Sequence, residues 1–371
     1  MQNKKKVLHL TYDMRIGGTE QVIKNIVQSM HGSDFEHSIL CIEQPIGPFG
    51  NMLINEGITI NAFQRKDGFD IALIKQIRNH IKQHNINVLH CHQYTPWVYG
   101  SLAAAFTHTK VIFTEHGRFY PDSSSWKRKL VNPILVGFTD KITAISKATQ
   151  QALVDFEFIP KQKIDVIYNG ITELRPDKKK VVTLRSELAI PDNTVVLGTV
   201  ARLDPIKNHT MMIKAFGKLL ATAPNCCLLI VGDGEEKATL KQLVQELAIT
   251  DHVIFTGYVE KPVHHLALMD VFLLPSLSEG TSMTLLEAMS LSIPIAATAV
   301  GGTPEIVQHK KNGELSANDE LQAYHHILET LVSNHEIRNT YGKQARTDYL
   351  HCFTAINMSQ RYETLYKTIQ N

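Results

Sequence analysis

Short apolar segments alternate with helical patterns along almost the whole chain, and the alternation occurs in two blocks. The first block contains strand-like runs such as VLHLTYD, HSILCIE and KVIFTEH, separated by segments of helical periodicity. After a polar, basic passage (ELRPDKKK) the pattern resumes with runs such as VVLGTVAR, CCLLIVGD and VFLLPS. Strands that alternate with helices predict parallel sheets with right-handed crossovers. The chain is therefore expected to be an α/β protein with two doubly wound, Rossmann-like domains.

The length of 371 residues also fits two domains better than one. We interpret the basic passage as the linker, with a hinge near residue 172, so that residues 1–171 and 172–353 form the two domains. Ligands of doubly wound sheets bind beyond the carboxyl ends of the strands. Two such domains facing each other predict a central cleft between them.

Composition excludes several classes of protein. An apolar content of 43%, a charged content of 20% and a formal charge of +2 are ordinary for a soluble globular protein and give no reason to expect nucleic acid. Five cysteines without a CxxC pair argue against a disulfide framework or a zinc ribbon and suggest a reducing compartment. No export signal or membrane-spanning window is apparent, which predicts a cytoplasmic protein with at most peripheral membrane contact.

The segment SEGTSMTLLEAM carries the strongest functional signal. A helix that opens at Ser282, Met283 and Thr284 offers unpaired N–H groups and a positive dipole end, where a phosphate can bind. Glu279 before this helix and Glu287 within it are carboxylates that can accept hydrogen bonds from sugar hydroxyls. Phosphate and hydroxyl acceptors side by side predict a site for a nucleotide sugar.

Two cations stand in VARLDPIKNH, directly after a strand. Arg202 and Lys207 can stabilise a leaving diphosphate, although a solvated basic loop is the alternative for this pair on its own. Gly17 and Gly18 follow the first strand and allow close approach to phosphate or sugar, or simply make a tight turn. Gly232 lies in VGDG, which lacks the third glycine of a dinucleotide fingerprint, so a nicotinamide cofactor is not expected.

Three histidines lie at strand ends. His116 ends KVIFTEH and can bond a substrate hydroxyl or affect proton transfer, or it can be a packing residue. His90 and His92 lie on one face of a strand, but no further metal ligands are evident, and His92 is expected to line the cleft. The chain has no DxD, GxSxG, HExxH or P-loop motif. We therefore expect no metal and no cofactor.

These motifs together resemble the retaining glycosyltransferases of the GT-B fold, family 4 of the sequence classification. The resemblance covers nearly the whole chain and extends over motifs in a typical order and spacing. The matching motifs are GGTE, TEHG, AISKAT, YNGI, ARLDPIKNH, VGDGEE, SEGTSMTLLEAM and AVGGTPEIV. One departure is Thr281-Ser282, where many relatives have Phe-Gly, and it leaves the identity of the donor sugar open.

The resemblance implies a role for each candidate residue. His116 would touch the transferred sugar, Arg202 and Lys207 would bind the departing diphosphate, and Glu279 would bond sugar hydroxyls. Glu287 would hold the ribose. The other residues implied to bind the donor lie in glycine-containing loops or at the helix start: Gly17, Gly18, Gly232, Gly280, Thr281, Ser282, Met283 and Thr284. The final segment, residues 354–371, would form a helix that returns to the N-terminal domain, with Phe353, Ile356, Tyr362, Leu365 and Tyr366 as a docking stripe.

The expected function is metal-independent, retaining transfer of a sugar from a nucleotide diphosphate to a glycan or lipid-linked acceptor. Synthesis of a surface polysaccharide (exopolysaccharide, capsule, O-antigen or lipopolysaccharide) is the expected context. The alternatives are a sugar-nucleotide epimerase and a non-catalytic protein that binds sugar nucleotides. Nothing in the sequence indicates the oligomeric state.

A possible membrane contact lies in the N-terminal domain. Trp126 and the basic run Lys127, Arg128 and Lys129 precede an apolar segment, a combination that can seat a helix on an anionic leaflet. A helix packed on the domain flank with a solvated basic edge explains the pattern equally well.

Overall fold

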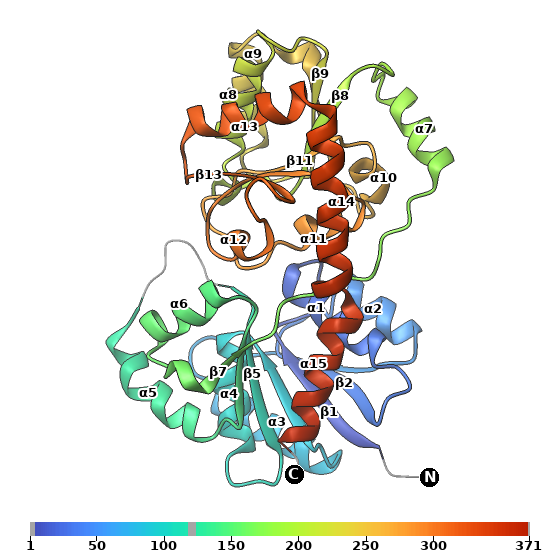
Figure 1. Cartoon of the computed structure of the whole chain (residues 1–371). Helices are drawn as coiled ribbons and strands as arrows, with labels where there is room; N and C mark the ends of the chain where they lie inside the picture. The colour runs from blue at the N-terminus through green and yellow to red at the C-terminus, as the bar shows by residue number, and fades with distance from the viewer. Residues whose placement is uncertain (1–3, 118–123, 370–371) are drawn as a thin grey trace. The chain divides into compact units, whose positions relative to one another are not determined.

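The computed structural model describes residues 4–117 and 124–369 and divides the chain into two compact units (Figure 1). Unit 1 comprises Met1–Thr172 and Ala355–Asn371, and unit 2 comprises Glu173–Thr354. Each unit is built on one parallel sheet, and its helices alternate with the strands. The expected α/β class with two Rossmann-like domains is therefore confirmed.

Unit 1 contains a sheet of seven strands in the order β3-β2-β1-β4-β5-β6-β7. The strands are β1 Lys5–Thr11, β2 Phe35–Cys41, β3 Thr59–Ala62, β4 Val88–His92, β5 Lys110–Glu115, β6 Lys141–Ala144 and β7 Ile164–Val166. The helices are α1 Gly18–Ser29, α2 Pro48–Asn55, α3 Ile71–Gln83, α4 Tyr94–Ala104, α5 Trp126–Gly137, α6 Lys147–Glu157 and α15 Ala355–Thr368. The central strands are almost fully buried, as in sheets covered by helices on both faces.

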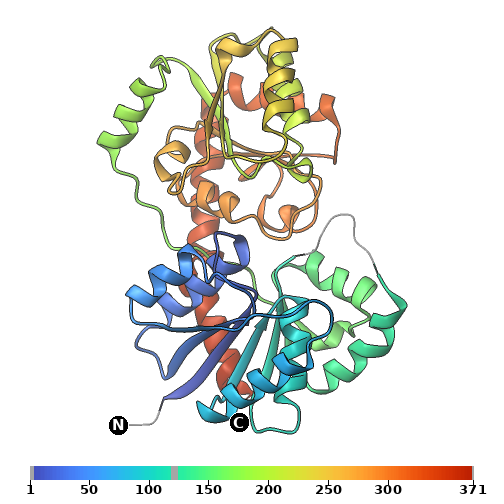
Figure 2. The ribbon, with the colours of Figure 1, turned by 180° about the vertical axis from the view of Figure 1, so that it is seen from behind.

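Helix α15 covers one face of this sheet, although it follows unit 2 in the sequence. Figure 1 shows it in front of the strands, and in Figure 2, from behind, it lies beyond them. Its buried Tyr362 and Tyr366 lie against the sheet, and Leu365 is also buried. Ile356, expected in the same stripe, is 62% exposed, so that assignment was wrong. It lies outside the side of the helix that is formed by the buried Ala355, Met358 and Tyr362.

Unit 2 contains six parallel strands in the order β10-β9-β8-β11-β12-β13. The strands are β8 Val195–Val200, β9 Cys226–Val231, β10 Val253–Gly257, β11 Val271–Leu274, β12 Ile295–Thr298 and β13 Gly313–Ser316. The helices are α7 Lys178–Glu187, α8 His209–Leu219, α9 Lys237–Glu246, α10 Val263–Leu266, α11 Met283–Ser290, α12 Thr303–Ile306, α13 Leu321–Ser333 and α14 His335–Cys352. Cys226 and Cys227 are buried in β9, as expected of core residues.

Two details of unit 2 differ from the sequence interpretation. The three lysines of ELRPDKKK are not linker but begin α7, because the Asp177 side chain caps the backbone N–H of Lys179. Strand β13 was not predicted, since its four residues carry too little apolar character to stand out. It extends the sheet beside β12 through parallel pairing.

Candidate functional site

The loop that follows β8 fixes the position of Lys207. Asp204 accepts a hydrogen bond from the backbone N–H of Lys207 (3.2 Å) and caps a 3₁₀ turn, Pro205–Lys207. Asn208 then adopts a left-handed conformation (φ 50°) and caps α8. The tight turn between these two caps leaves the lysine side chain to extend away from the loop, 24% exposed.

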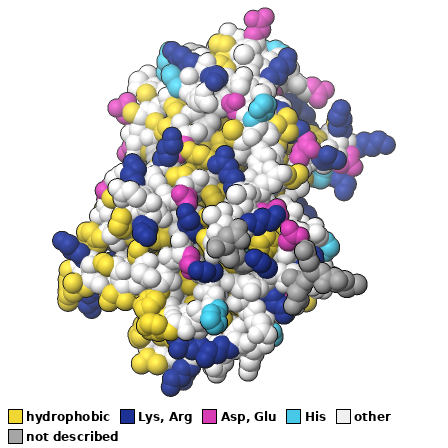
Figure 3. All heavy atoms as spheres, turned by 60° about the horizontal axis from the view of Figure 1, so that its bottom comes forward, with side chains coloured by type: hydrophobic (Ala, Val, Ile, Leu, Met, Phe, Trp, Pro, Cys, Tyr) yellow, Lys and Arg dark blue, Asp and Glu magenta, His cyan; other side chains and the backbone are white. Residues whose placement is uncertain are grey.

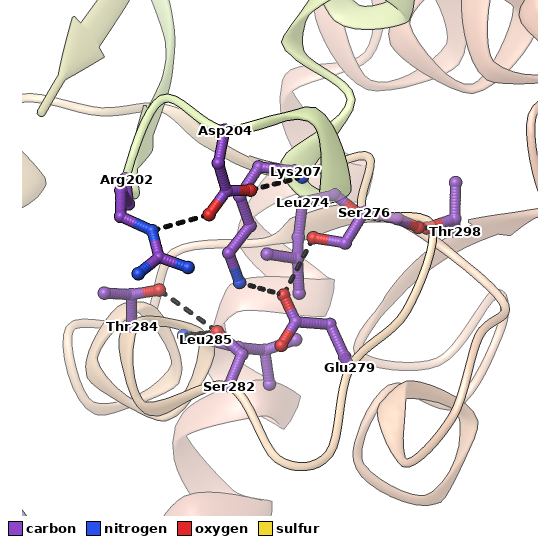
Figure 4. Close-up of polar contacts among 10 residues, drawn as sticks. All are labelled: Arg202, Asp204, Lys207, Leu274, Ser276, Glu279, Ser282, Thr284, Leu285 and Thr298. Carbon is purple, nitrogen blue, oxygen red and sulfur yellow. Dashed lines mark hydrogen bonds and ion pairs between the residues drawn. The ribbon is translucent and has the colours of Figure 1, made fainter. Parts of the chain in front are cut away.

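Lys207 reaches a carboxylate 72 residues away in the sequence. Its Nζ lies 2.6 Å from Oε1 of Glu279, and the hydroxyl of Ser276 donates to the same oxygen at 2.7 Å (Figure 4). The Glu279 side chain is only 9% exposed. Among the residues that the structure describes, Oε2 of Glu279 has no partner, so this oxygen can accept hydrogen bonds from a bound hydroxyl.

A turn that contains Gly301 and Gly302 packs against the backbone of Glu279. Gly301 has φ 50°, and a Cβ atom there would lie 1.8 Å from the carbonyl oxygen of Glu279. The N–H of Gly302 donates to that same oxygen at 3.1 Å. Thr298, at the end of β12, donates to the carbonyl of Ser276 at 2.5 Å. The motif AVGGTPEIV therefore supports the Ser276–Glu279 loop through direct backbone contact.

Helix α11 begins beside these charges at the expected position, and Ser282 is its N-cap. The Ser282 hydroxyl accepts from the N–H of Leu285 at 3.4 Å and lies 3.1 Å from the Thr284 hydroxyl. The first N–H groups of the helix have no intrahelical acceptor by geometry, so they can bind an anion. Figure 4 shows the side chains of Arg202 and Lys207 extending toward this helix start.

Arg202 is held at one edge only. Its Nε donates to Oδ2 of Asp204 at 2.6 Å, while the side chain is 75% exposed, which leaves the terminal nitrogens of the guanidinium accessible. The neighbouring loop packs closely here: Gly232 has φ 147°, and a Cβ at this position would lie 1.9 Å from the carbonyl oxygen of Ala201. The structure thus gives Gly232 a packing role beneath the arginine loop.

The remaining donor-site candidates of unit 2 lie on the same segment. Gly280 and Thr281 connect Glu279 to the N-cap of α11, Met283 is the first residue of that helix, and Glu287 lies in its second turn. Two cations, a carboxylate and a helix N-terminus therefore come together within one unit. Such an arrangement can stabilise a diphosphate and orient a polyhydroxyl group.

In unit 1, Gly17 precedes α1 and Gly18 begins it. The Glu20 carboxylate lies against Gly17, where a Cβ atom would come within 2.2 Å of its Oε2. Burial and, to a smaller extent, nearby Asp13 raise the pKa of Glu20 from 4.5 to about 7. A titratable group with such a shift beside a candidate phosphate loop was not predicted, because its burial depends on tertiary packing.

His116 follows β5, and its Nε2 lies 2.8 Å from Nδ1 of His92. Burial lowers the pKa of His116 to about 3. His92 is fully buried and also bonds His9 at 3.0 Å. A contact between His92 and an acceptor stays a prediction, because the side chain has no exposed surface in this structure.

Sequence reasoning missed two residues that organise the cations and the carboxylate: Asp204 and Ser276. The signal for Asp204 was an aspartate directly before Pro-x-Lys, the pattern of a turn cap. Ser276 had no local signal, because its contact with Glu279 depends on how β11 ends.

A metal-ligand geometry also occurs within the described residues. His9, His90 and His92 bring ring nitrogens within 4.8 Å of one another. All six of their ring nitrogens already have hydrogen-bond partners: His37 and His92 for His9, Tyr366 and Thr114 for His90, and His9 and His116 for His92. Hydrogen bonding therefore accounts for this cluster.

Each of the two units matches the model of a known protein family. The family model for glycosyltransferase family 4 matches residues 16–173, and the model for glycosyl transferases group 1 matches residues 182–348. N-acetyl-alpha-D-glucosaminyl L-malate synthase of Bacillus anthracis is 28% identical over 325 residues, 86% of this chain and 84% of that protein. An Escherichia coli UDP-Gal:alpha-D-GlcNAc-diphosphoundecaprenol alpha-1,3-galactosyltransferase is 24% identical and covers 98% of this chain and 97% of its own length.

Solved structures agree on the fold. The Anabaena protein HepE in complex with UDP superposes with a TM-score of 0.87 at 21% identity, over 98% of this chain and 100% of that one. A glycosyltransferase from Rickettsia africae gives a TM-score of 0.88 at 19% identity, over 99% of each chain. With both family models matched in order along the chain, the protein belongs to glycosyltransferase family 4, with the two Rossmann-like domains of the GT-B fold.

Proposed function

We propose that the chain transfers a sugar from a nucleotide diphosphate sugar to a glycan or lipid-linked acceptor, with retention of anomeric configuration and without a metal. The observation that carries this proposal is the ion pair of Lys207 with Glu279 beside the start of α11. The lysine and the helix dipole would neutralise the diphosphate, and Oε2 of Glu279 would accept a hydrogen bond from a sugar hydroxyl. Loss of one such electrostatic group costs on the order of 10²–10³ in rate.

The division of labour follows from the contacts. Arg202 and Lys207 neutralise charge as the diphosphate leaves, and this is the service that a metal ion supplies in other transferases. Glu279 orients the sugar and keeps Lys207 fixed when no donor is bound. Glu287, one helical turn further along, would hold the ribose. Gly17, Gly18 and His116 stay predicted donor contacts from unit 1.

The donor class is proposed from the relatives. HepE was solved with UDP and with UDP-glucose, and the E. coli galactosyltransferase uses UDP-Gal by name. We therefore propose a UDP-sugar as donor and a diphospholipid-linked glycan as the acceptor class. A thermal-shift screen of UDP- and GDP-sugars identifies the donor, because a ligand that binds the folded state raises its apparent stability.

Transfer is then measured as release of nucleotide diphosphate with and without acceptor, and NMR of the product gives its anomeric configuration. Lys207→Ala and Glu279→Ala should each lower the rate at least about 100-fold while the protein stays folded. Lys218→Ala is the matched control, since Lys218 bonds Gln322 at 3.1 Å at an exposed position of α8. Rates within a few-fold of wild type in either folded site variant would remove that residue from the mechanism.

Helix α5 supports a second part of the proposal, peripheral binding to an anionic membrane. Trp126, Leu130 and Ile134 recur every four residues along one side of the helix and are 71%, 62% and 59% exposed. Leu135 and Asn132 form its packing side. Figure 3 shows hydrophobic and basic side chains next to one another on the face that it draws. No described helix is long and apolar enough to span a bilayer, so any contact through α5 would be interfacial.

The three basic residues Lys127, Arg128 and Lys129 do not share one environment. Arg128 bonds Glu157 at 2.8 Å and lies over the Tyr94 ring, so it packs inward and supports the helix. Lys127 and Lys129 are exposed. Each should contribute about 1 kcal/mol at an anionic surface, so replacing both by Gln should weaken binding roughly 30-fold.

Trp126 can report this binding directly. Of the two tryptophans, Trp97 is fully buried, so a blue shift of emission with anionic vesicles arises from Trp126. Replacing Lys179 and Lys180 by Gln removes the same charge from exposed positions on α7 and serves as the control. No spectral shift with vesicles, or an equal loss in both double variants, would mean that α5 does not bind the membrane.

A further inference from the structure

Four histidines cross unit 1: His37, His9 and His92 lie in β2, β1 and β4, and His116 directly follows β5. In the parallel register Val7 pairs with His37, His9 with His90, and His92 with Thr114. His9 therefore lies two residues beyond the partner of His37. In the same way, His92 lies two residues beyond the partner of His9, and His116 lies two residues beyond the partner of His92. Because side chains alternate faces with a period of two, all four rings project from one face as a diagonal row.

The rings form one continuous hydrogen-bonded chain. His37 Nδ1 lies 2.9 Å from His9 Nε2, His9 Nδ1 lies 3.0 Å from His92 Nε2, and His92 Nδ1 lies 2.8 Å from His116 Nε2. Ring centroids are 5.1–5.3 Å apart and neighbouring planes differ by only 22–28°. Every bond therefore joins the Nδ1 of one ring to the Nε2 of the next.

Both ends of the chain are unpaired. The Nε2 atom of His37 and the Nδ1 atom of His116 are buried and have no hydrogen-bond partner among the described residues. Buried polar atoms without a partner are uncommon and call for an explanation. Burial lowers the pKa of every member, to about 4 for His37 and about 3 for His116, so the rings are neutral near pH 7.

Neutral imidazole carries one proton, on either Nδ1 or Nε2. Three N–H···N bonds joined in this regular way allow only two arrangements of neutral rings: all four protonated on Nδ1, or all four on Nε2. The tautomer of His116 is therefore tied to the tautomer of His37. His90 lies beside the row but is outside this constraint, because it bonds Tyr366 (2.8 Å) and Thr114 (2.6 Å) instead.

We propose that His37, His9, His92 and His116 form a proton wire that sets the hydrogen-bonding character of the free Nδ1 of His116. A proton that adds to Nδ1 of His116 displaces the Nε2 proton onto His92. The next two transfers move protons from His92 to His9 and from His9 to His37, and His37 releases its Nε2 proton. The entering proton comes from a hydroxyl or a water molecule at Nδ1 of His116, and the leaving proton passes to a water molecule at Nε2 of His37. No ring keeps a charge, and the reverse transfers restore the starting arrangement.

The wire makes His37 and His9 positioning residues for His116. In the all-Nε2 arrangement the free Nδ1 of His116 accepts a hydrogen bond, and in the all-Nδ1 arrangement it donates one. This consequence for a sugar hydroxyl rests on the proposed function, whereas the coupling of tautomers does not. The two are therefore tested by different measurements.

The first test uses the wild-type chain labelled with ¹⁵N-histidine. Ring nitrogen shifts report the tautomer of each histidine, and scalar couplings across N–H···N bonds report their connections. The expected result is one tautomer shared by all four rings, with three couplings that link them in series. A mixed set of tautomers, or missing couplings, would overturn the proposal without any variant.

The second test sets one end of the wire. In His37→Asp, studied at a pH at which the carboxyl group is ionised, a group that only accepts replaces Nδ1, so His9 must carry its proton on Nε2. His116, three bonds away, should then be protonated on Nε2 alone. Adding His9→Leu should release His116 from this control, and the matched variant His90→Gln should leave its shifts unchanged. Protonation of His116 on Nδ1 in folded His37→Asp, or an equal change in His90→Gln, would refute the wire.

Activity gives a separate outcome. If the wire orients His116 for transfer, His9→Leu should lower kcat at least tenfold with little change in KM for the donor. Coupled tautomers in a protein without transfer activity would support the wire and contradict the proposed function. Normal transfer by a protein whose four histidine tautomers are independent would contradict the wire and support the proposed function.

Discussion

Gly301→Ala tests how far the placement of Glu279 depends on the glycine turn behind it. Alanine at φ 50° costs on the order of 1–3 kcal/mol in backbone strain. Its Cβ would also start 1.8 Å from the Glu279 carbonyl oxygen, and an ordinary contact begins near 3.4 Å, so a shift of about 1.6 Å is required. Such a shift is incompatible with the 2.6 Å bond to Lys207.

A misplacement of about 1 Å at a catalytic group can cost roughly 100-fold in rate. We therefore expect Gly301→Ala to lose about that factor in nucleotide diphosphate release, beyond any loss of stability. The variant is compared at a temperature where urea titration shows that it is fully folded.

Gly68→Ala separates the two effects. Gly68 also has a positive φ (76°), but an added Cβ would meet nothing within 4 Å. It should lose about 1 kcal/mol of unfolding free energy and keep its transfer rate. Transfer within threefold of wild type in Gly301→Ala, with a stability loss equal to that of Gly68→Ala, would refute the claim that this turn positions the carboxylate.

Three further predictions concern other parts of the molecule. Glu20→Gln should raise the free energy of unfolding by about 3 kcal/mol above pH 7 and leave it unchanged below pH 4.5. The reason is that the raised pKa of Glu20 in the folded protein makes wild-type stability fall as pH rises between those values. Urea unfolding at pH 4 and pH 8 measures the difference between variant and wild type, and equal differences at both pH values would contradict the prediction. Tyr366→Phe should lower the free energy of unfolding by about 1–2 kcal/mol, because His90 Nδ1 loses its buried partner; an unchanged urea midpoint would show that the bond adds nothing. Transfer should survive EDTA, and a complete loss that Mg²⁺ restores would refute the metal-free mechanism.

The fold was predictable because buried parallel strands are nearly continuous apolar runs, and such runs are legible in one sequence. The helix start at Ser282 was equally local, since its capping pattern lies within a few residues. Register is not local. A doubly wound domain implies that β1 lies between β2 and β4, but it does not say which residues of these strands pair. The row from His37 to His116 could therefore not be predicted, although His116 itself was.

The same limit explains most of the other errors and omissions. Asp204 carried a local capping signal that was missed, whereas the contact of Ser276 with Glu279 depends on how β11 ends. Ile356 has the right character for a packing stripe, yet only the docked position of α15 decides which of its sides faces the sheet. The burial of Glu20, which raises its pKa, depends on tertiary packing and could not be recognised in the sequence.

The sequence position of α15 has a consequence for synthesis. Unit 1 cannot complete its core as it emerges from the ribosome, because the helix that covers its histidine row is made only after Glu173–Thr354. At 5–20 residues per second this interval is roughly ten to forty seconds. During this interval, the part of the unit 1 sheet that α15 covers stays exposed beside α1 while unit 2 can fold. The nascent chain is thus expected to engage chaperones at that face, and ribosome-bound chains halted before residue 355 should show it as protease-sensitive.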